Sequence, residues 1–125
     1  MLTIIFFNNN KKNIPHTALI TINGTINKNE EDSAGNIIDI LNNAFNNNYV
    51  KGIILNINSP GGSPVQSHMI YNHILKLKKE HPNIKIYSLI EDMGASGVYL
   101  IAAATNKIYC NKSSIVGSIG VILNT

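Results

Sequence analysis

Residues 51–62, with the sequence KGIILNINSPGG, indicate the fold class of this 125-residue chain. The segment is a run of aliphatic residues that stops abruptly at Ser59, Pro60 and two glycines. Three consecutive large aliphatic residues, at 53–55, predict a strand buried on both faces, as in a sheet with helices packed against it. The Pro-Gly-Gly break then predicts a sharp turn into the next element.

Strand and helix patterns alternate on both sides of this segment, by apolar spacing and by helix start and stop signals. The expected elements are a strand at 18–26, a helix after Ser33, the strand at 51–58, a helix at 64–80, a strand at 84–90, a helix at 98–104 and extended pieces at 107–110 and 114–122. The alternation predicts an α/β domain. We expect residues 1–17 to form a loose arm and residues 18–125 to form the domain.

The composition excludes several kinds of function. The net charge is +3, but all ten basic residues are Lys and they are mostly scattered, whereas nucleic-acid readers present clustered Arg and stacking aromatics. We therefore expect no nucleic-acid partner. The single cysteine, Cys110, excludes an internal disulfide and a Cys-based zinc site, and we expect it to be a small buried residue. No metal or other cofactor is expected.

The apolar runs are short. None approaches the roughly 20 residues that span a bilayer, and residues 1–7 lack the basic start and small-residue cleavage site of an export signal. We therefore expect neither an export signal nor an anchor in this chain, which leaves the cytoplasm as the default location.

Two glycine-containing breaks follow predicted strands and precede predicted helices, at residues 58–62 and 93–98. Such loops lie at the carboxyl edge of a sheet, where α/β proteins build their sites. Uncovered N–H groups of Gly62 and Gly97 can stabilise an oxyanion, and Ser96 is sterically open to attack a carbonyl group. Taken singly, the first break also fits a simple turn, and Ser96 also fits a helix cap.

The other candidate side chains are less suggestive. Among the four His residues, His68 and His73 are five residues apart, a poor spacing for shared metal ligation, so we expect partly exposed helix residues. The pair at 91–92, Glu-Asp, is interpreted as a solvated strand end. Only Lys107 and Lys112 follow Ser96 among the lysines.

Taken together, the ordered motifs resemble a known peptidase family. The Asn-Ser-Pro-Gly-Gly turn, the Gly-Ala-Ser-Gly turn that opens an Ala-rich helix, and the segment Ser-Ser-Ile-Val-Gly-Ser-Ile-Gly-Val at 113–121 resemble the signal peptide peptidase A (protease IV) family. This family belongs to the Clp protease/crotonase-like superfamily. The resemblance covers residues 18–122, nearly the whole chain.

The resemblance implies a β-β-α superhelix and a serine endopeptidase with a Ser/Lys dyad that cleaves short peptides, notably remnant signal peptides. It places the nucleophile at Ser96 and the oxyanion-hole amides at Gly62 and Gly97, and it gives residues 117–120 no catalytic role. It also implies a homo-oligomer and a possible membrane association, since family members commonly carry an anchor. We further expect Gly62→Val to damage catalysis more than folding, by crowding the anion site.

The chain departs from the family pattern at the general base, because neither Lys107 nor Lys112 matches the family's dyad lysine. We therefore expect the fold to be truncated at its C-terminus, with the base outside this segment or on another subunit. One alternative is a catalytically inactive family member that acts as an assembly module. Another is a crotonase-like acyl-CoA enzyme, which needs no serine at position 96. A Clp-type triad is disfavoured because all four His residues precede Ser96.

Overall fold

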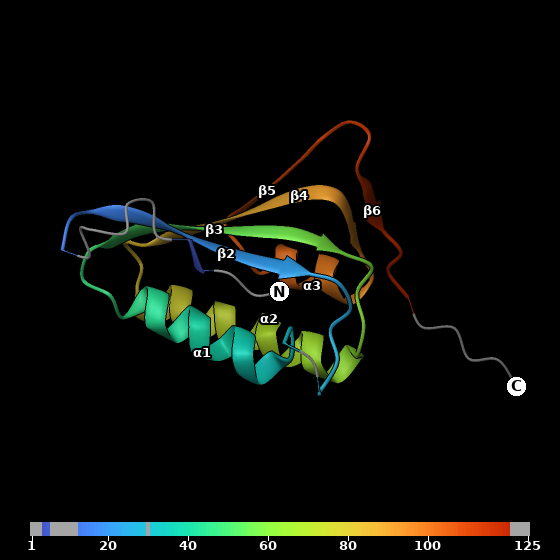
Figure 1. Cartoon of the computed structure of the whole chain (residues 1–125), viewed down its shortest axis with the longest axis horizontal. Coiled ribbons are helices and arrows are strands. Elements are labelled where there is room, and N and C mark those ends of the chain that lie inside the picture. The colour runs from blue at the N-terminus through green and yellow to red at the C-terminus, as the bar shows by residue number, and fades with distance from the viewer. Residues whose placement is uncertain (1–3, 6–12, 30, 121–125) are drawn as a thin grey trace, which may run out of the picture.

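The computed structural model describes residues 4–5, 13–29 and 31–120. They form a sheet with helices packed against it (Figure 1). The strands are β1 (Ile4–Ile5), β2 (His16–Asn23), β3 (Val50–Ser59), β4 (Lys85–Ala95), β5 (Lys107–Cys110) and β6 (Ile115–Gly117), and the helices are α1 (Ala34–Phe45), α2 (Pro64–Glu80) and α3 (Gly97–Ala103). The predicted α/β alternation is confirmed, and none of the described helices is long and apolar enough to cross a membrane.

The strand order in the sheet is β1-β2-β3-β4-β5, and β2 to β5 are all parallel. β1 adds antiparallel to β2, and β2 begins at His16, so four residues of the predicted arm (4, 5, 16 and 17) are part of the sheet. Residues 1–3 and 6–12 of that arm lie outside the described residues. β6 pairs with the carboxyl end of β4, where Gly94 lies opposite Val116. Because the parallel strands end at one edge, the loops that follow β3 and β4 meet there.

The core lies between the sheet and the three helices, which lie on the same side of it (Figure 1). On β3, the side chains of Ile53, Leu55 and Ile57 are fully buried against the helices. Ile54 and Asn56 point to the opposite face and are partly exposed. The expected burial of this strand on both faces is therefore wrong, because no described helix covers the second face.

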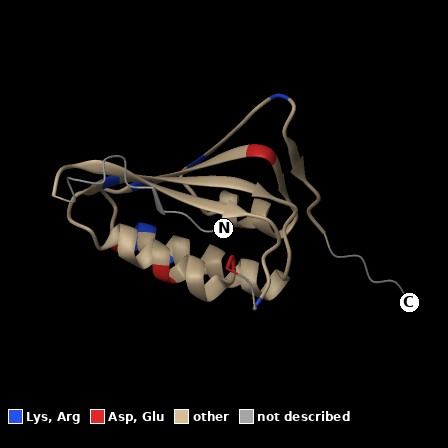
Figure 2. Ribbon diagram, in the orientation of Figure 1, with Lys and Arg blue, Asp and Glu red and all other residues tan. Residues whose placement is uncertain are grey.

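Local signals explain where two helices begin. The Ser33 hydroxyl accepts a hydrogen bond from the amide of Asn36 and so caps α1, as predicted. Ser63 caps α2 in the same way, through the amide of Gln66, and Pro64 occupies the first turn, where a missing N–H costs nothing. Charged residues are few, and Figure 2 shows them on loops, on strands and on the helices.

Candidate active site

Ser96 occupies the turn between β4 and α3. Its backbone has φ 56° and ψ −127°, a conformation that residues with a Cβ rarely adopt. The residue stands at the N-cap position of α3, yet its side chain makes no capping hydrogen bond. The interpretation of Ser96 as an ordinary cap is therefore disfavoured, and its hydroxyl is left available at a strained turn.

Backbone hydrogen bonds hold this turn in place. The Ser96 amide donates to the carbonyl of Gly117 in β6 at 2.7 Å, and the Ser96 carbonyl accepts from the amide of Tyr99 at 3.0 Å. Strain of this kind costs about 1–3 kcal/mol and persists only where the surroundings fix it. The segment around Gly117 thus supports the turn from outside, and the Ser96 amide is already engaged.

The loop after β3 presents the amide of Gly62. Ile26 donates its N–H to the Gly61 carbonyl at 2.9 Å and accepts from the Ser63 amide at 2.8 Å, which makes a parallel bridge to Gly62. In such a bridge the central residue directs its own N–H and C=O away from the partner strand. The N–H of Gly62 therefore points away from Ile26. The neighbouring Gly61 amide is already bonded to the Ser59 hydroxyl.

The two loops touch through their glycines. A Cβ added at Gly61 would lie 2.8 Å from both the Ala95 carbonyl oxygen and the Ser96 Cβ. A Cβ at Gly97 would lie 3.9 Å from the Gly62 nitrogen and would overlap the Ser67 hydroxyl. Only glycine allows the backbones to approach so closely. The structure thus brings the three predicted site residues together, although their catalytic roles remain predictions.

The expectation for Gly62→Val is wrong about where the side chain would go. A Cβ at Gly62 would collide with the backbone of Ile26, within 2.6 Å of its nitrogen, and the Gly62 φ of +152° also disfavours a side chain. The substituent would therefore strike the bridge that shapes the loop, so the substitution harms folding directly.

Ser96, Gly62 and Gly97 line one pocket of about 270 Å³. The remaining lining residues are Pro64, Ser67, His68, Leu100, Ile119 and Gly120. The volume is slightly below the roughly 300–1,000 Å³ of pockets for drug-sized ligands, so it suits one side chain of a peptide. A larger cavity, about 330 Å³, lies among residues 45–51 and 81–84, and it contains no candidate nucleophile.

His68 is the titratable side chain in the lining, and sequence reasoning gave it no role. It is exposed on α2 and its ring stacks on Tyr71, with centroids 5.9 Å apart. Its approach to Ser96 follows from the contact of α2 with α3, where Ser67 packs against Gly97. The lining contains no lysine, and neither Lys107 nor Lys112 contributes to it.

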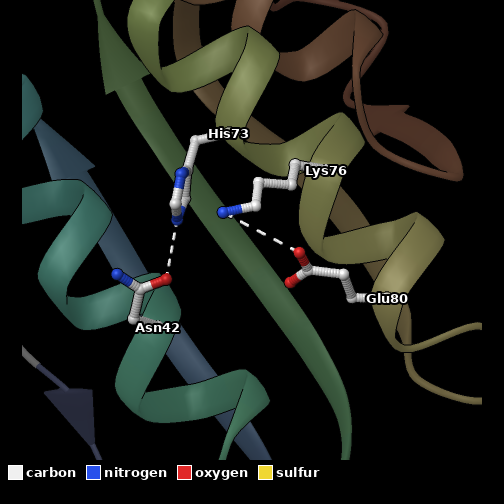
Figure 3. Close-up of polar contacts among 4 residues, drawn as sticks. All are labelled: Asn42, His73, Lys76 and Glu80. Atoms are coloured by element: carbon white, nitrogen blue, oxygen red, sulfur yellow. Dashed lines mark hydrogen bonds and ion pairs between the residues drawn. The ribbon is translucent and has the colours of Figure 1, made fainter.

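The other candidate side chains lie outside this pocket. His73 pairs with Asn42 of α1 at 2.7 Å, while Lys76 and Glu80 form an ion pair one turn further along α2 (Figure 3). The pKa of His73 is lowered from 6.5, first by burial and then by the nearby Lys76. No group of metal-ligating side chains occurs among the described residues.

Two further predictions meet different outcomes. Glu91 and Asp92 are exposed at the bend near the end of β4, as the interpretation of a solvated strand end required. Cys110 is exposed at the end of β5, so its expected burial is wrong. β5 ends the strand path β1-β2-β3-β4-β5, and Ile108, two residues before Cys110, packs against the core.

Part of the chain matches a known protein family. Residues 78–125, which include Ser96 and Gly97, match the model of peptidase family S49. A relative from Enterococcus faecium that carries the name signal peptide peptidase SppA is 41% identical over 75 residues, covering 60% of this chain and 21% of that protein. Residues 78–125 thus carry the sequence pattern of peptidase family S49. Protease 4 of Haemophilus influenzae, another relative, is 35% identical over 114 residues, which cover 87% of this chain and 18% of that protein.

A further relative carries the name of a different kind of protein. The Na(+)/H(+) antiporter NhaA of Brucella melitensis is 48% identical over 83 residues, covering 66% of this chain and 11% of that protein. In these three relatives the chain spans 11% to 21% of the full length. The activity of a whole protein therefore comes to this chain only as a proposal.

Proposed function

We propose that this chain supplies the nucleophile and the oxyanion hole of a serine endopeptidase of the signal peptide peptidase type. One observation carries the proposal: the uncapped hydroxyl of Ser96, on a strained turn, shares a pocket with the backbones of Gly62 and Gly97. The match of residues 78–125 to peptidase family S49 supports the same chemistry.

The reaction begins with attack of Ser96 Oγ on the carbonyl carbon of the scissile peptide bond. The serine proton passes to a general base, and the carbonyl oxygen becomes an oxyanion that accepts hydrogen bonds from the amides of Gly62 and Gly97. The intermediate then collapses and releases the amine, which takes a proton from the protonated base. Water attacks the resulting ester in the same way, which frees the acid and restores Ser96.

We assign the base to a lysine outside residues 1–125, on a further part of the polypeptide or on another subunit. A lysine accepts the serine proton only when desolvation or a neighbouring cation lowers its pKa. The lining of the described pocket contains no such residue, which supports a base from elsewhere.

The substrates proposed are short or extended peptides, including remnant signal peptides. The pocket wall beside Ser96 is largely apolar, with Leu100, Ile119 and Pro64. Signal peptides are rich in small and apolar side chains, which such a wall accommodates. Association of the working enzyme with a membrane is part of the same proposal.

A fluorophosphonate probe tests the nucleophile directly in the folded protein as the cell makes it. We expect one covalent label per chain, mapped to Ser96 by mass spectrometry and lost in Ser96→Ala. The exposed Ser113, changed to Ala, is the matched control and should leave labelling unchanged. A label on another serine, or labelling that persists in Ser96→Ala, would contradict the proposal.

His68 offers a second test, since it is the titratable residue in the pocket wall. If a lysine from elsewhere is the base, His68→Gln should change the labelling rate of Ser96 by less than about threefold. A loss of 10²-fold or more, typical of a missing general base, would instead assign the proton transfer to His68.

A catalytically inactive assembly module is the second candidate. The absence of a lysine from the described pocket lining favours it. It predicts a folded oligomer in which Ser96 reacts with the probe no faster than an ordinary exposed serine such as Ser113.

A further inference from the structure

The face of the sheet opposite the helices carries a contiguous apolar patch. Its members, hereafter the outer patch, are Leu19, Ile54, Tyr87, Leu89 and Tyr109. Strand pairing places Leu19, Ile54 and Tyr87 in one row across the sheet, and Leu89 and Tyr109 in the next. The rings of Tyr87 and Tyr109 meet edge to face, with centroids 6.1 Å apart.

The outer patch is unusually open for a parallel sheet. Tyr87 is 38% exposed, Leu89 44% and Tyr109 48%. Parallel sheets are normally covered on both faces, and large contiguous apolar patches on a protein surface mark contact sites. Within residues 4–5, 13–29 and 31–120, no helix lies on this face.

The charges along β4 indicate what fits this face. The outward side chains of β4 are, in order, Lys85, Tyr87, Leu89 and Glu91. The side-chain amide of Asn56, on the same face, donates a hydrogen bond to the Glu91 carboxylate and so holds it there. Figure 2 shows the acidic end of β4 as a red segment near its carboxyl end.

The order of outward side chains along β4 is complementary in charge to the same order read in the opposite direction. A second β4 laid across the first in the opposite direction would set each Lys85 against a Glu91 and each Tyr87 against a Leu89. On β5, Lys107 lies beside Tyr87 and Tyr109 beside Leu89, so the same reversal sets Lys107 against the ring of Tyr109. Within one chain, Lys107 already lies 5.3 Å from that ring, so the ring face suits a cation.

We propose that the outer patch binds a second copy of this chain around a two-fold axis. The axis lies between the two sheets and perpendicular to β4, so that each patch covers the other. Isologous contacts of this kind use the same surface on both subunits, and two sheets pack face to face with nearly aligned strands. The surface is separate from the Ser96 pocket, so the dimer does not depend on the proposed peptidase activity.

The area of the interface sets the expected affinity of the dimer. Three strands of about eight residues and the four residues of β5, about 4.8 Å apart and rising 3.3 Å per residue, define roughly 450 Å² of sheet per copy. About 900 Å² in total is below the roughly 1,200–2,000 Å² of stable complexes. The dimer should therefore form and dissociate across the micromolar range.

Sedimentation velocity over that range, with paired charge reversals, tests the proposal. Lys85→Glu and Glu91→Lys should each weaken dimerisation by about tenfold or more, because either one sets like charges together twice across the axis. The double variant Lys85→Glu/Glu91→Lys should restore the dimer. Lys79→Glu, on the exposed side of α2, is the matched control and should leave the dissociation constant unchanged.

Leu89→Lys provides an independent variant, since it places a charge at the centre of the patch and should give a folded monomer. Circular dichroism verifies the fold of each variant. A wild-type chain that stays monomeric across the micromolar range would overturn the proposal. The finding that another polypeptide, or another segment of the same polypeptide, covers this face would also overturn it. A dimer whose dissociation constant is unchanged by either single charge reversal would also overturn the proposal. So would a double variant that fails to restore the dimer.

Discussion

At the scale of single residues, Ser96 combines backbone strain with an available hydroxyl. Its φ of 56° favours glycine, and no hydrogen bond of its side chain repays the strain. Ser96→Gly should therefore be more stable than Ser96→Ala by about 1 kcal/mol, because Ala keeps the Cβ while Gly removes it. Urea unfolding measures the difference. Equal stability, or a more stable Ala variant, would show that the turn is unstrained.

Gly62 is the second residue whose identity the fold demands. Because a Cβ there would strike the Ile26 backbone, Gly62→Ala should lower the free energy of unfolding by about 2–3 kcal/mol. Gly35, in the exposed first turn of α1, has open space around it, so Gly35→Ala should raise stability by about 0.5–1 kcal/mol. Changes of opposite sign in the free energy of unfolding, measured with urea, would support the bridge between Ile26 and Gly62. A Gly62→Ala variant with unchanged stability would contradict it.

At the scale of elements, the packing of α1 on α2 should depend on pH through His73. Its pKa is lowered in the folded protein, so below 6.5 the unfolded chain binds more protons and the folded state loses stability as the pH falls. The wild type should lose more stability than His73→Gln between pH 7.5 and 5.5. Thermal unfolding of both proteins at the two pH values checks this, and identical losses would contradict it.

The sequence predicted these elements well because their signals are local. Apolar spacing and the start signal Ser33 predicted α1 and α2 closely, and the Pro-Gly-Gly and Gly-Ala-Ser-Gly turns located the candidate site. The contact partners could not be predicted, because they depend on long-range packing. The bridge from Ile26 to Gly62 and the approach of His68 to the pocket both belong to this class.

At the scale of the whole molecule, the structure separates two surfaces. The carboxyl edge of the sheet carries the Ser96 pocket, while the face opposite the helices carries the outer patch. The run of aliphatic residues at 53–55 could not show that one face of β3 is open. A strand covered by helices on both faces and a strand covered on its second face by a partner have the same apolar composition. The β-β-α superhelix, the arm at 1–17 and the truncated domain stay predictions.

Dimerisation through the outer patch should couple stability to concentration. Because only the folded chain dimerises, the midpoint of thermal unfolding should rise with protein concentration across the micromolar range. In Lys85→Glu the rise should begin only at a protein concentration about tenfold higher or more. Calorimetry at several concentrations measures it, and a wild-type midpoint independent of concentration would contradict the proposed interface.

The central claim is that Ser96 Oγ and the amides of Gly62 and Gly97 surround one tetrahedral centre. A crystal structure with a peptide boronate tests it most directly, because the bound boron stands for the attacked carbonyl carbon and one of its oxygens for the oxyanion. The account predicts a covalent bond from boron to Ser96 Oγ, with that oxygen within about 2.7–3.1 Å of both amides. A boronate bound elsewhere, or a Ser96 adduct whose oxygens face away from both amides, would contradict it.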